Sequence, residues 1–246
     1  MEKIDIVIIG AGIAGIASAY YLQKNFPNIR FKILESRSSV GGTWDQMRFP
    51  GVRADNDMYT YGFSFDPWNG SIIGDGKEIK NYLSKVTDKF NIKKNVLFDT
   101  EVKSLSWKDN KWIIKTDLKK FTSQYVICCT GSRDRKNPHL PKFKNEKIYQ
   151  GKIIHTQAWG NTDFKDKNVT IVGSGCTAIT MAPSIIKEAK KVTLVQRSPA
   201  WIINIDSKEK STRIYKTFQV LWDYFSSRIF KKFQRKKMIS GNTYYN

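Results

Sequence analysis

Two glycine-rich turns hold the residues of this 246-residue chain whose types and spacing best suit binding chemistry. In the first turn, Gly10, Gly12 and Gly15 directly follow a mostly apolar run over residues 3–9. Glycine at these three positions permits a tight turn, close approach of a pyrophosphate, and close packing of the next helix on the strand. The N–H groups and the positive dipole end of that helix can bind phosphate. The spacing therefore predicts a dinucleotide site.

The second turn, residues 173–178, repeats this pattern, and the residue that ends the following strand distinguishes the two. Glu35 lies about 20 residues after Gly15, where a carboxylate can accept hydrogen bonds from ribose hydroxyls. The corresponding strand of the second unit ends at Gln196, Arg197 and Ser198. A guanidinium in place of the acid fits a 2′-phosphate, so we expect FAD in the first site and NADPH in the second. The alternative is a duplicated structural unit with one empty site.

The elements that must position these residues form an α/β fold with two Rossmann-like βαβ units. Apolar runs predict buried parallel strands, and apolar residues at helical spacing predict the helices between them. The expected strands are 3–9, 31–34 and 124–129 in the first unit, and 168–172 and 191–195 in the second. Expected helices follow each glycine turn and cover 77–90, and short strands at 96–98, 102–107 and 112–116 form an antiparallel excursion.

The domain boundaries follow from the composition of the connecting segments. Residues 132–147 contain Pro138 and Pro141 and have the composition of a linker. We therefore expect the N-terminal part of an FAD-binding domain at 1–147 and an incomplete NADPH-binding domain at 148–205. A basic helical insertion or tail is expected at 206–246.

The formal charge of +20 does not by itself indicate nucleic acid, because Lys and Arg are spread along the chain without a nucleic-acid motif. Residues 213–237 combine apolar residues at helical spacing with Lys and Arg. Such a helix either lies on an anionic membrane or packs on its own protein. Three cysteines make no disulfide framework, and no apolar run is long enough to span a bilayer. We expect a cytoplasmic protein, with peripheral contact to the inner membrane face as an alternative, and no metal site.

Residues 149–159 hold the F-x-G-x-x-x-H-x-x-x-W pattern, with Tyr149 in the Phe position. This segment resembles the fingerprint of type I Baeyer–Villiger monooxygenases. The loop from Gly42 through the Phe-Pro-Gly of 49–51 to Asp55 resembles the second signature of that family. The Gly-Gly-Thr-Trp-Asp of 41–45 is similar to the branch that includes the ethionamide-activating monooxygenase.

The resemblance implies a set of functional residues. Those expected to bind FAD, some also reached by NADPH, are Gly10, Gly12, Ala14, Gly15, Glu35, Gly42, Thr43, Trp44, Asp45, Gln46, Arg53, Ala54, Asp55, Tyr61 and Val102. Those expected to bind NADPH are Gly173, Ser174, Gly175, Cys176, Thr177, Ala178, Ile179, Arg197 and Ser198. The expected catalytic residues are Arg53, Asp55, His155 and Trp159.

The implied activity is FAD- and NADPH-dependent oxygenation of a ketone or a thioether by O2, through a C4a-peroxyflavin. Family members are longer and return to complete the FAD domain, so we expect this chain to correspond to their N-terminal half, inactive or uncoupled by itself. One alternative is a non-catalytic nucleotide-binding remnant with a membrane-binding helix. The other, a flavin disulfide reductase, is disfavoured because Cys128 and Cys129 are adjacent and Cys176 lies in a turn.

Overall fold

The computed structural model describes residues 1–132, 138, 140–198 and 202 of the chain. Contacts divide it into one unit made of residues 1–53 and 75–202, and a second made of 54–74 and 203–246. The expected tail at 206–246 and the membrane contact at 213–237 lie outside the described residues. None of the described helices is long and apolar enough to cross a bilayer.

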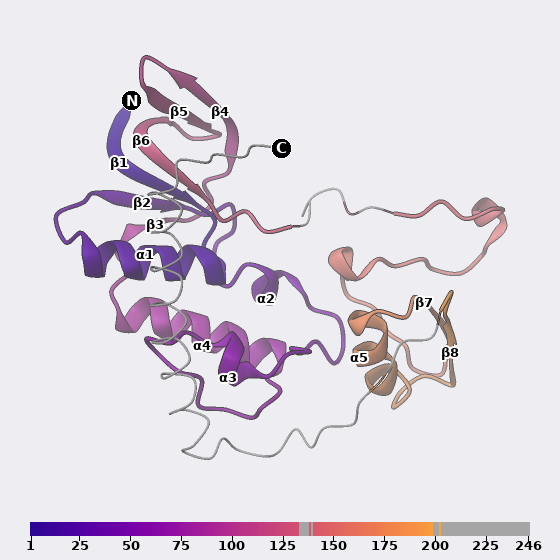
Figure 1. The fold of residues 1–246 in the computed structure, drawn as a ribbon. Coiled ribbons are helices and arrows are strands. Elements are labelled where there is room, and N and C mark those ends of the chain that lie inside the picture. The colour runs from indigo at the N-terminus through magenta and orange to yellow at the C-terminus, as the bar shows by residue number, and fades with distance from the viewer. Residues whose placement is uncertain (133–137, 139, 199–201, 203–246) are drawn as a thin grey trace, which may run out of the picture. The chain divides into compact units, whose positions relative to one another are not determined.

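A six-stranded sheet in the order β3-β2-β1-β6-β5-β4 forms the main layer of the first unit. The strands are β1 (Glu2–Ile9), β2 (Phe31–Leu34), β3 (Val96–Leu97), β4 (Val102–Lys108), β5 (Lys111–Thr116) and β6 (Lys120–Cys128). The central strand β1 runs parallel to β2 and β6, with Ile8 opposite Ile33 and Ile127 (Figure 1). The expected α/β fold is confirmed.

The antiparallel part of the sheet differs from the expectation in one strand. β5 pairs antiparallel with β4, as predicted, and it also pairs antiparallel with the start of β6, which the sequence did not predict. β3, however, pairs parallel with β2, so the prediction that residues 96–98 belong to the antiparallel excursion is wrong. The chain returns from β2 to β3 through a helical crossover, and crossover connections join parallel strands.

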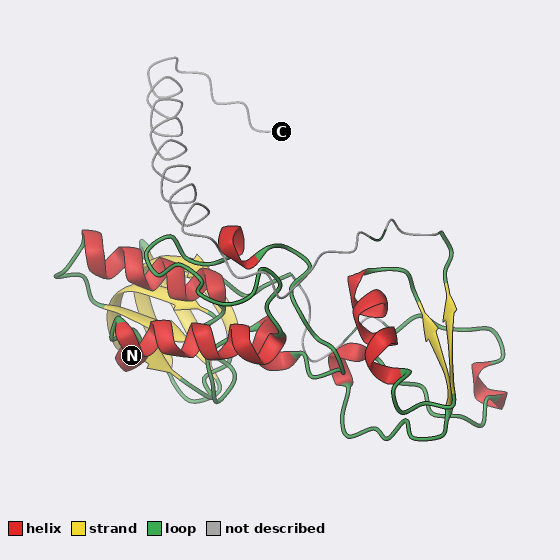
Figure 2. Ribbon diagram, turned by 90° about the horizontal axis from the view of Figure 1, so that it is seen from below, coloured by secondary structure: helices red, strands yellow, loops and turns green. Residues whose placement is uncertain are grey.

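Two long helices lie on the same face of this sheet (Figures 1 and 2). α1 (Ile13–Asn25) packs on β1, β2 and β6, and α4 (Gly76–Lys89) packs against α1. Asp75 starts α4 with a capping box: its carboxylate accepts from Glu78 N at 2.7 Å, and the Glu78 carboxylate accepts from Asp75 N at 3.1 Å. The fully buried Ile8, Ile16 and Leu83 show that apolar side chains of sheet and helices build the core.

Short helices occupy the connections. These are α2 (Thr43–Gln46), α3 (Met58–Tyr61), and the 3-10 turns η1 (Lys93–Asn95), η2 (Glu146–Ile148) and η3 (Thr156–Ala158). α3 belongs to the second unit, where Asp57 caps it by accepting a hydrogen bond from Thr60 N at 2.9 Å. Also in that unit, Trp68 donates from Nε1 to the carbonyl of Ser71 at 2.8 Å.

The second βαβ motif consists of β7 (Asn168–Val172), α5 (Cys176–Ile185) and β8 (Lys191–Val195), close to its predicted bounds. β7 and β8 are parallel, and within the described residues β8 pairs with no other strand. Ile171, Met181 and Ile185 are buried together with Met47 and Phe49 from the connection after β2. Val172, Leu194 and Val195 remain exposed, which leaves an apolar edge on this small sheet.

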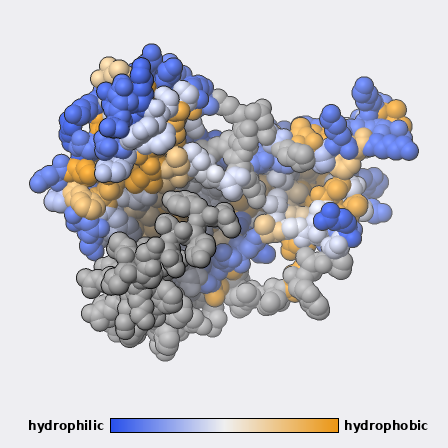
Figure 3. Space-filling view, turned by 45° about the horizontal axis from the view of Figure 1, so that its top comes forward, coloured by the Kyte–Doolittle hydropathy of each residue, from blue (hydrophilic) through white to orange (hydrophobic). Residues whose placement is uncertain are grey.

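Exposed apolar side chains also occur on the main sheet. Tyr125 of β6 is 62% exposed, and Trp107 of β4 is exposed among the Lys residues of the β4–β5 hairpin. Figure 3 shows one face of the molecule, where hydrophobic side chains gather next to hydrophilic ones.

Candidate dinucleotide-binding sites

The three glycines of the first turn have different surroundings, which match the roles predicted for them. Gly10 has a φ of 101°, which only glycine adopts readily. A side-chain carbon on Gly15 would lie 1.9 Å from the carbonyl oxygen of Gly10, so the helix packs directly on the turn. A carbon on Gly12 would meet only the Cα of Gly42, at 3.6 Å. Gly12 and Gly42 therefore approach each other closely without side chains, and Gly12 is half-buried and presents bare backbone.

The N-terminus of α1 carries no side-chain cap. Its N-cap is Gly12, which provides no side-chain hydrogen bond, and its first turn contains no acidic residue. Ala14 is exposed in that turn. The first N–H groups of a helix lack partners within the helix, so here they can bind an anion. Together with the bare surface at Gly12, this arrangement fits the pyrophosphate of a dinucleotide.

Glu35 directly follows β2, as predicted, but its carboxylate is fully buried. Its Oε2 accepts a hydrogen bond from the N–H of Ala11 at 2.7 Å, and its Oε1 accepts from the N–H of Arg37 at 2.9 Å. The acid therefore lies against the glycine turn and joins that turn to the segment after β2. Contact with a ribose would require one of these oxygens to become accessible.

The connection after β2 forms α2, and its predicted cofactor-binding residues differ from one another in exposure. Thr43 is exposed, and Trp44 and Gln46 are half-buried. Asp45 is enclosed by Arg37, Lys80 and Arg48. Sequence reasoning missed these three cations, because Lys80 lies on α4, far along the chain, and no motif relates it to Asp45.

The second turn has a similar but more open geometry. Gly173 has a φ of 137°, and its N–H donates to the carbonyl of Val195 at 2.9 Å. Gly175 caps α5 without a side-chain hydrogen bond, and no acidic residue lies in the first turn. An added carbon on either glycine would meet no atom within 4 Å. The remaining predicted residues at this turn are Ser174, Cys176, Thr177, Ala178 and Ile179. Arg197 and Ser198 follow β8 and are exposed.

His155 and Trp159 of the fingerprint lie at the two ends of η3. Nδ1 of His155 accepts a hydrogen bond from Gln157 N at 3.3 Å and so caps this turn. The ring of Trp159 lies 6.3 Å from that of Phe49 and 5.5 Å from that of Phe164. The fingerprint therefore packs against the second signature, through an aromatic contact that the sequence did not predict.

Two other predicted residues, Arg53 and Asp55, are both exposed and fall in different units of the chain. Arg53 forms an isolated antiparallel bridge with Asp75, next to the start of α4. Ala54 and Tyr61 belong to the same unit as Asp55. Val102 starts β4 and packs against a cluster that includes Ile9, the residue directly before the glycine turn, and Phe121.

Two features bear on other chemistries. No disulfide joins the three cysteines. Cys128 ends β6 and Cys129 follows it directly, so the two do not have the spacing of a CxxC redox pair. Within the described residues no group of three His, Cys, Asp or Glu side chains could hold a metal ion.

The fold and the two turns define a protein with paired dinucleotide-binding motifs. Comparison with known proteins identifies the family to which the chain belongs. Residues 7–234 match the family model of pyridine nucleotide-disulphide oxidoreductases, and the chain belongs to this family.

Its relatives within the family are flavin monooxygenases. The chain is 42% identical over 218 residues to the probable FAD-binding monooxygenase AlmA of an Acinetobacter species, covering 84% of this chain and 44% of AlmA. It is 39% identical over 212 residues to the FAD-containing monooxygenase EthA of Mycobacterium tuberculosis, covering 82% of this chain and 43% of EthA.

A solved structure, oxidised steroid monooxygenase bound to NADP, matches with a TM-score of 0.72 and 30% identity, covering 82% of this chain and 40% of that one. The predicted resemblance to this class of monooxygenases is confirmed. The chain spans less than half the length of the curated relatives that it matches.

Proposed function

We propose that residues 1–246 form the FAD- and NADPH-binding N-terminal half of a flavin monooxygenase. The observation that supports this most strongly is the pair of glycine turns. Each leads into a helix with an uncapped N-terminus, yet one following strand ends at Glu35 and the other is followed by Arg197. An acid and a guanidinium at these positions distinguish FAD from NADPH. The relatives named FAD-binding and the neighbour bound to NADP agree with this assignment.

The residues that would hold each cofactor follow from the geometry. At the first turn, the N–H groups at the start of α1 and the bare backbone of Gly12 would bind the FAD pyrophosphate. At the second turn, the start of α5 and Arg197 would bind the phosphates of NADPH. FAD supplies acceptance of a hydride and activation of O2. This chain contributes binding, orientation and the choice between the two nucleotides.

The proposed substrate is a ketone or a thioether, together with O2, because the two sequence signatures resemble those of Baeyer–Villiger monooxygenases. The aromatic contact between Phe49 and Trp159 gives these signatures a shared structural role. It ties the connection after β2 to the fingerprint that precedes the second turn, so a change at one can reach the other.

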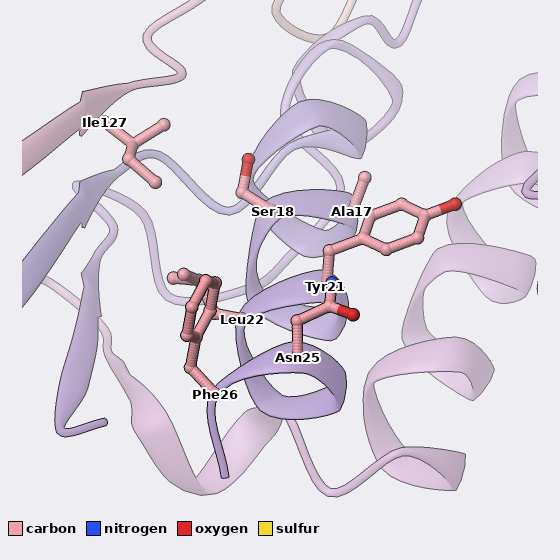
Figure 4. A pocket seen from close by; sticks show the side chains of 7 residues that line it. All are labelled: Ala17, Ser18, Tyr21, Leu22, Asn25, Phe26 and Ile127. Atoms are coloured by element: carbon pink, nitrogen blue, oxygen red, sulfur yellow. The ribbon is translucent and has the colours of Figure 1, made fainter. Parts of the chain in front are cut away.

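We also propose that a C-terminal half, as long as that of the relatives, completes the first unit. β5 pairs with β6 only up to Ser123, so the described pairings leave one edge of β6 open from Gln124 to Cys128. Beside this edge lies an open groove of about 360 Å³. Ile127 lines it from β6, and six side chains of α1 and its end line the rest: Ala17, Ser18, Tyr21, Leu22, Asn25 and Phe26 (Figure 4).

The proposed function predicts how residues 1–246 behave in an assay with NADPH, O2, a simple ketone and a thioether. Oxygen transfer needs a reaction space closed to water, and among the described residues Ala14 of the first turn and Cys176 of the second are exposed. We expect NADPH to be oxidised, O2 to be reduced to hydrogen peroxide, and no oxygenated product to form. Oxygenated product formed in a ratio near one to the NADPH consumed would contradict the need for a further half.

The same assay tests the alternative of a non-catalytic remnant. Such a remnant would bind nucleotide but oxidise no NADPH when FAD is added, and a protein that binds neither FAD nor NADPH would overturn the proposed function.

A further inference from the structure

Asp45 is a buried acid surrounded by cations. Its side chain is 1% exposed, and its Oδ2 accepts a hydrogen bond from Arg37 Nε at 2.5 Å. Lys80 forms a close ion pair with its Oδ1, and the guanidinium of Arg48 lies 3.5 Å away. Arg37 and Arg48 also donate to the main-chain carbonyl of Asp45, at 3.3 and 3.2 Å.

This cluster connects three elements. Arg37 belongs to the segment that follows β2, Asp45 to α2 and Lys80 to α4. The backbone N–H of Arg37 also donates to Glu35, which in turn accepts from Ala11 in the glycine turn. Hydrogen bonds and ion pairs thus run without a gap from the start of α1 to α4.

Packing keeps Asp45 inside this cluster. A side-chain carbon on Gly41 would lie 3.3 Å from Cβ of Asp45, and Gly41 has a φ of 124°. The tight approach of Gly41 closes the cluster on that side. With 1% of its side chain exposed, Asp45 has no surface left for a ligand, whereas the neighbouring Thr43 is exposed.

We propose that Asp45 is a positioning residue and not a cofactor ligand: it fixes the segment from Arg37 to Arg48 so that Gly42 and Thr43 are held ready for FAD. The identity of the cofactor as FAD rests on the proposed function, but the rigidity of the segment can be measured without FAD. Removing one member of a buried ion pair leaves the other charges uncompensated, so the segment should loosen when the carboxylate is lost. A preset binding surface raises affinity because less ordering is needed on binding.

The protonation state agrees with this role. Burial raises the pKa of the Asp45 carboxyl, but hydrogen bonds from Lys80, Ser39 and Arg37 lower it more, and the pKa is lowered overall. Asp45 is therefore ionised at neutral pH, as the cluster requires.

The test uses residues 1–246 with Asp45→Asn, Lys80→Met and both changes together. Asp5→Asn is the matched control, because it removes an exposed ion pair to Arg30 that lies in no proposed site. Two readouts are taken: trypsin cleavage after Arg37 and Arg48 followed by mass spectrometry, and FAD affinity by fluorescence titration. We expect Asp45→Asn to raise the cleavage rate at these two sites and weaken FAD binding, each by at least about tenfold, with Asp5→Asn unchanged in both.

Lys80→Met should give smaller effects in the same direction, because Arg37 still pairs with Asp45. This variant decides the matter if Asp45→Asn does not fold. Weaker FAD binding without faster cleavage would show that Asp45 contacts the cofactor, and unchanged cleavage with unchanged affinity would show that the cluster positions nothing. If the unaltered chain binds no FAD, the proposed function fails, while faster cleavage in Asp45→Asn would still establish the positioning role.

Discussion

Gly12 and Gly15 lie in the same turn, yet substitutions at the two positions should fail for different reasons. Gly12→Val should fold, because its first side-chain carbon meets only Gly42 at ordinary contact distance. It should nevertheless lose FAD binding, because the side chain fills the approach of the pyrophosphate. The measurement is flavin content after purification, together with the melting temperature.

The matched variant is Gly15→Ala, whose added carbon would lie 1.9 Å from a backbone oxygen. It should lower the melting temperature with or without FAD. Normal flavin content in Gly12→Val would refute the placement of the pyrophosphate at this turn.

Arg197 should decide between the two nicotinamide nucleotides. Arg197→Ala should weaken NADPH binding by about 1.5–3 kcal/mol, because a charge-assisted pair with the 2′-phosphate is lost. NADH binding should stay nearly unchanged, because NADH has no 2′-phosphate. Binding titrations with both nucleotides check this. Lys191→Ala, at the other end of β8, serves as the control and should leave both affinities unchanged. Equal weakening of NADPH and NADH would assign Arg197 another role.

At the residue scale, the sequence allowed us to predict those structural roles that depend only on the local backbone geometry. The roles of Gly10 and Gly15 follow from the turn itself, and their positions in the structure agree with them. The environment of Asp45 could not be predicted in this way. Its partner Lys80 lies far along the chain on α4, and only the packing of α2 near α4 brings the two side chains together.

At the scale of elements, the cluster around Asp45 should make the anchoring of α2 depend on pH. Because the folded-state pKa of Asp45 is lowered, its stabilisation is complete above the unfolded pKa of about 3.9 and is lost as the pH falls through the folded value. The free energy of unfolding of the unaltered chain should exceed that of Asp45→Asn by about 2 kcal/mol at neutral pH. Denaturant titrations from pH 7 down to acid should show this difference constant at first and then shrinking. A difference that grows on acidification would contradict the ionised cluster.

The elements also show where a sequence pattern stops being informative. Long apolar runs and helical spacing predicted β1, β2, β7, β8 and α4 closely. β3 has two residues, too few to show a period, and its direction is set by the crossover through α4. The pairing of a short strand is therefore a property of the connection before it, which the strand's own residues do not reveal.

At the scale of the whole chain, exposed strand edges should favour self-association. Val195 of β8 is 47% exposed, and β8 pairs only with β7 in the described part of the chain. An open apolar edge can pair with another copy. Val195→Lys should therefore reduce concentration-dependent association in sedimentation velocity experiments. Leu118→Lys replaces an equally apolar and more exposed residue that lies in the turn between β5 and β6, outside any strand. Equal reduction by both variants would show that general hydrophobicity, and not the edge, drives association.

The first glycine turn should bind FAD, and the ratio of bound flavin to protein measures this binding. The chain is purified, saturated with FAD, freed of unbound flavin by gel filtration, and its visible flavin absorbance is compared with its protein concentration. We predict one FAD per chain for the unaltered protein and none for Gly12→Val. A folded, unaltered chain that retains no flavin would contradict the account.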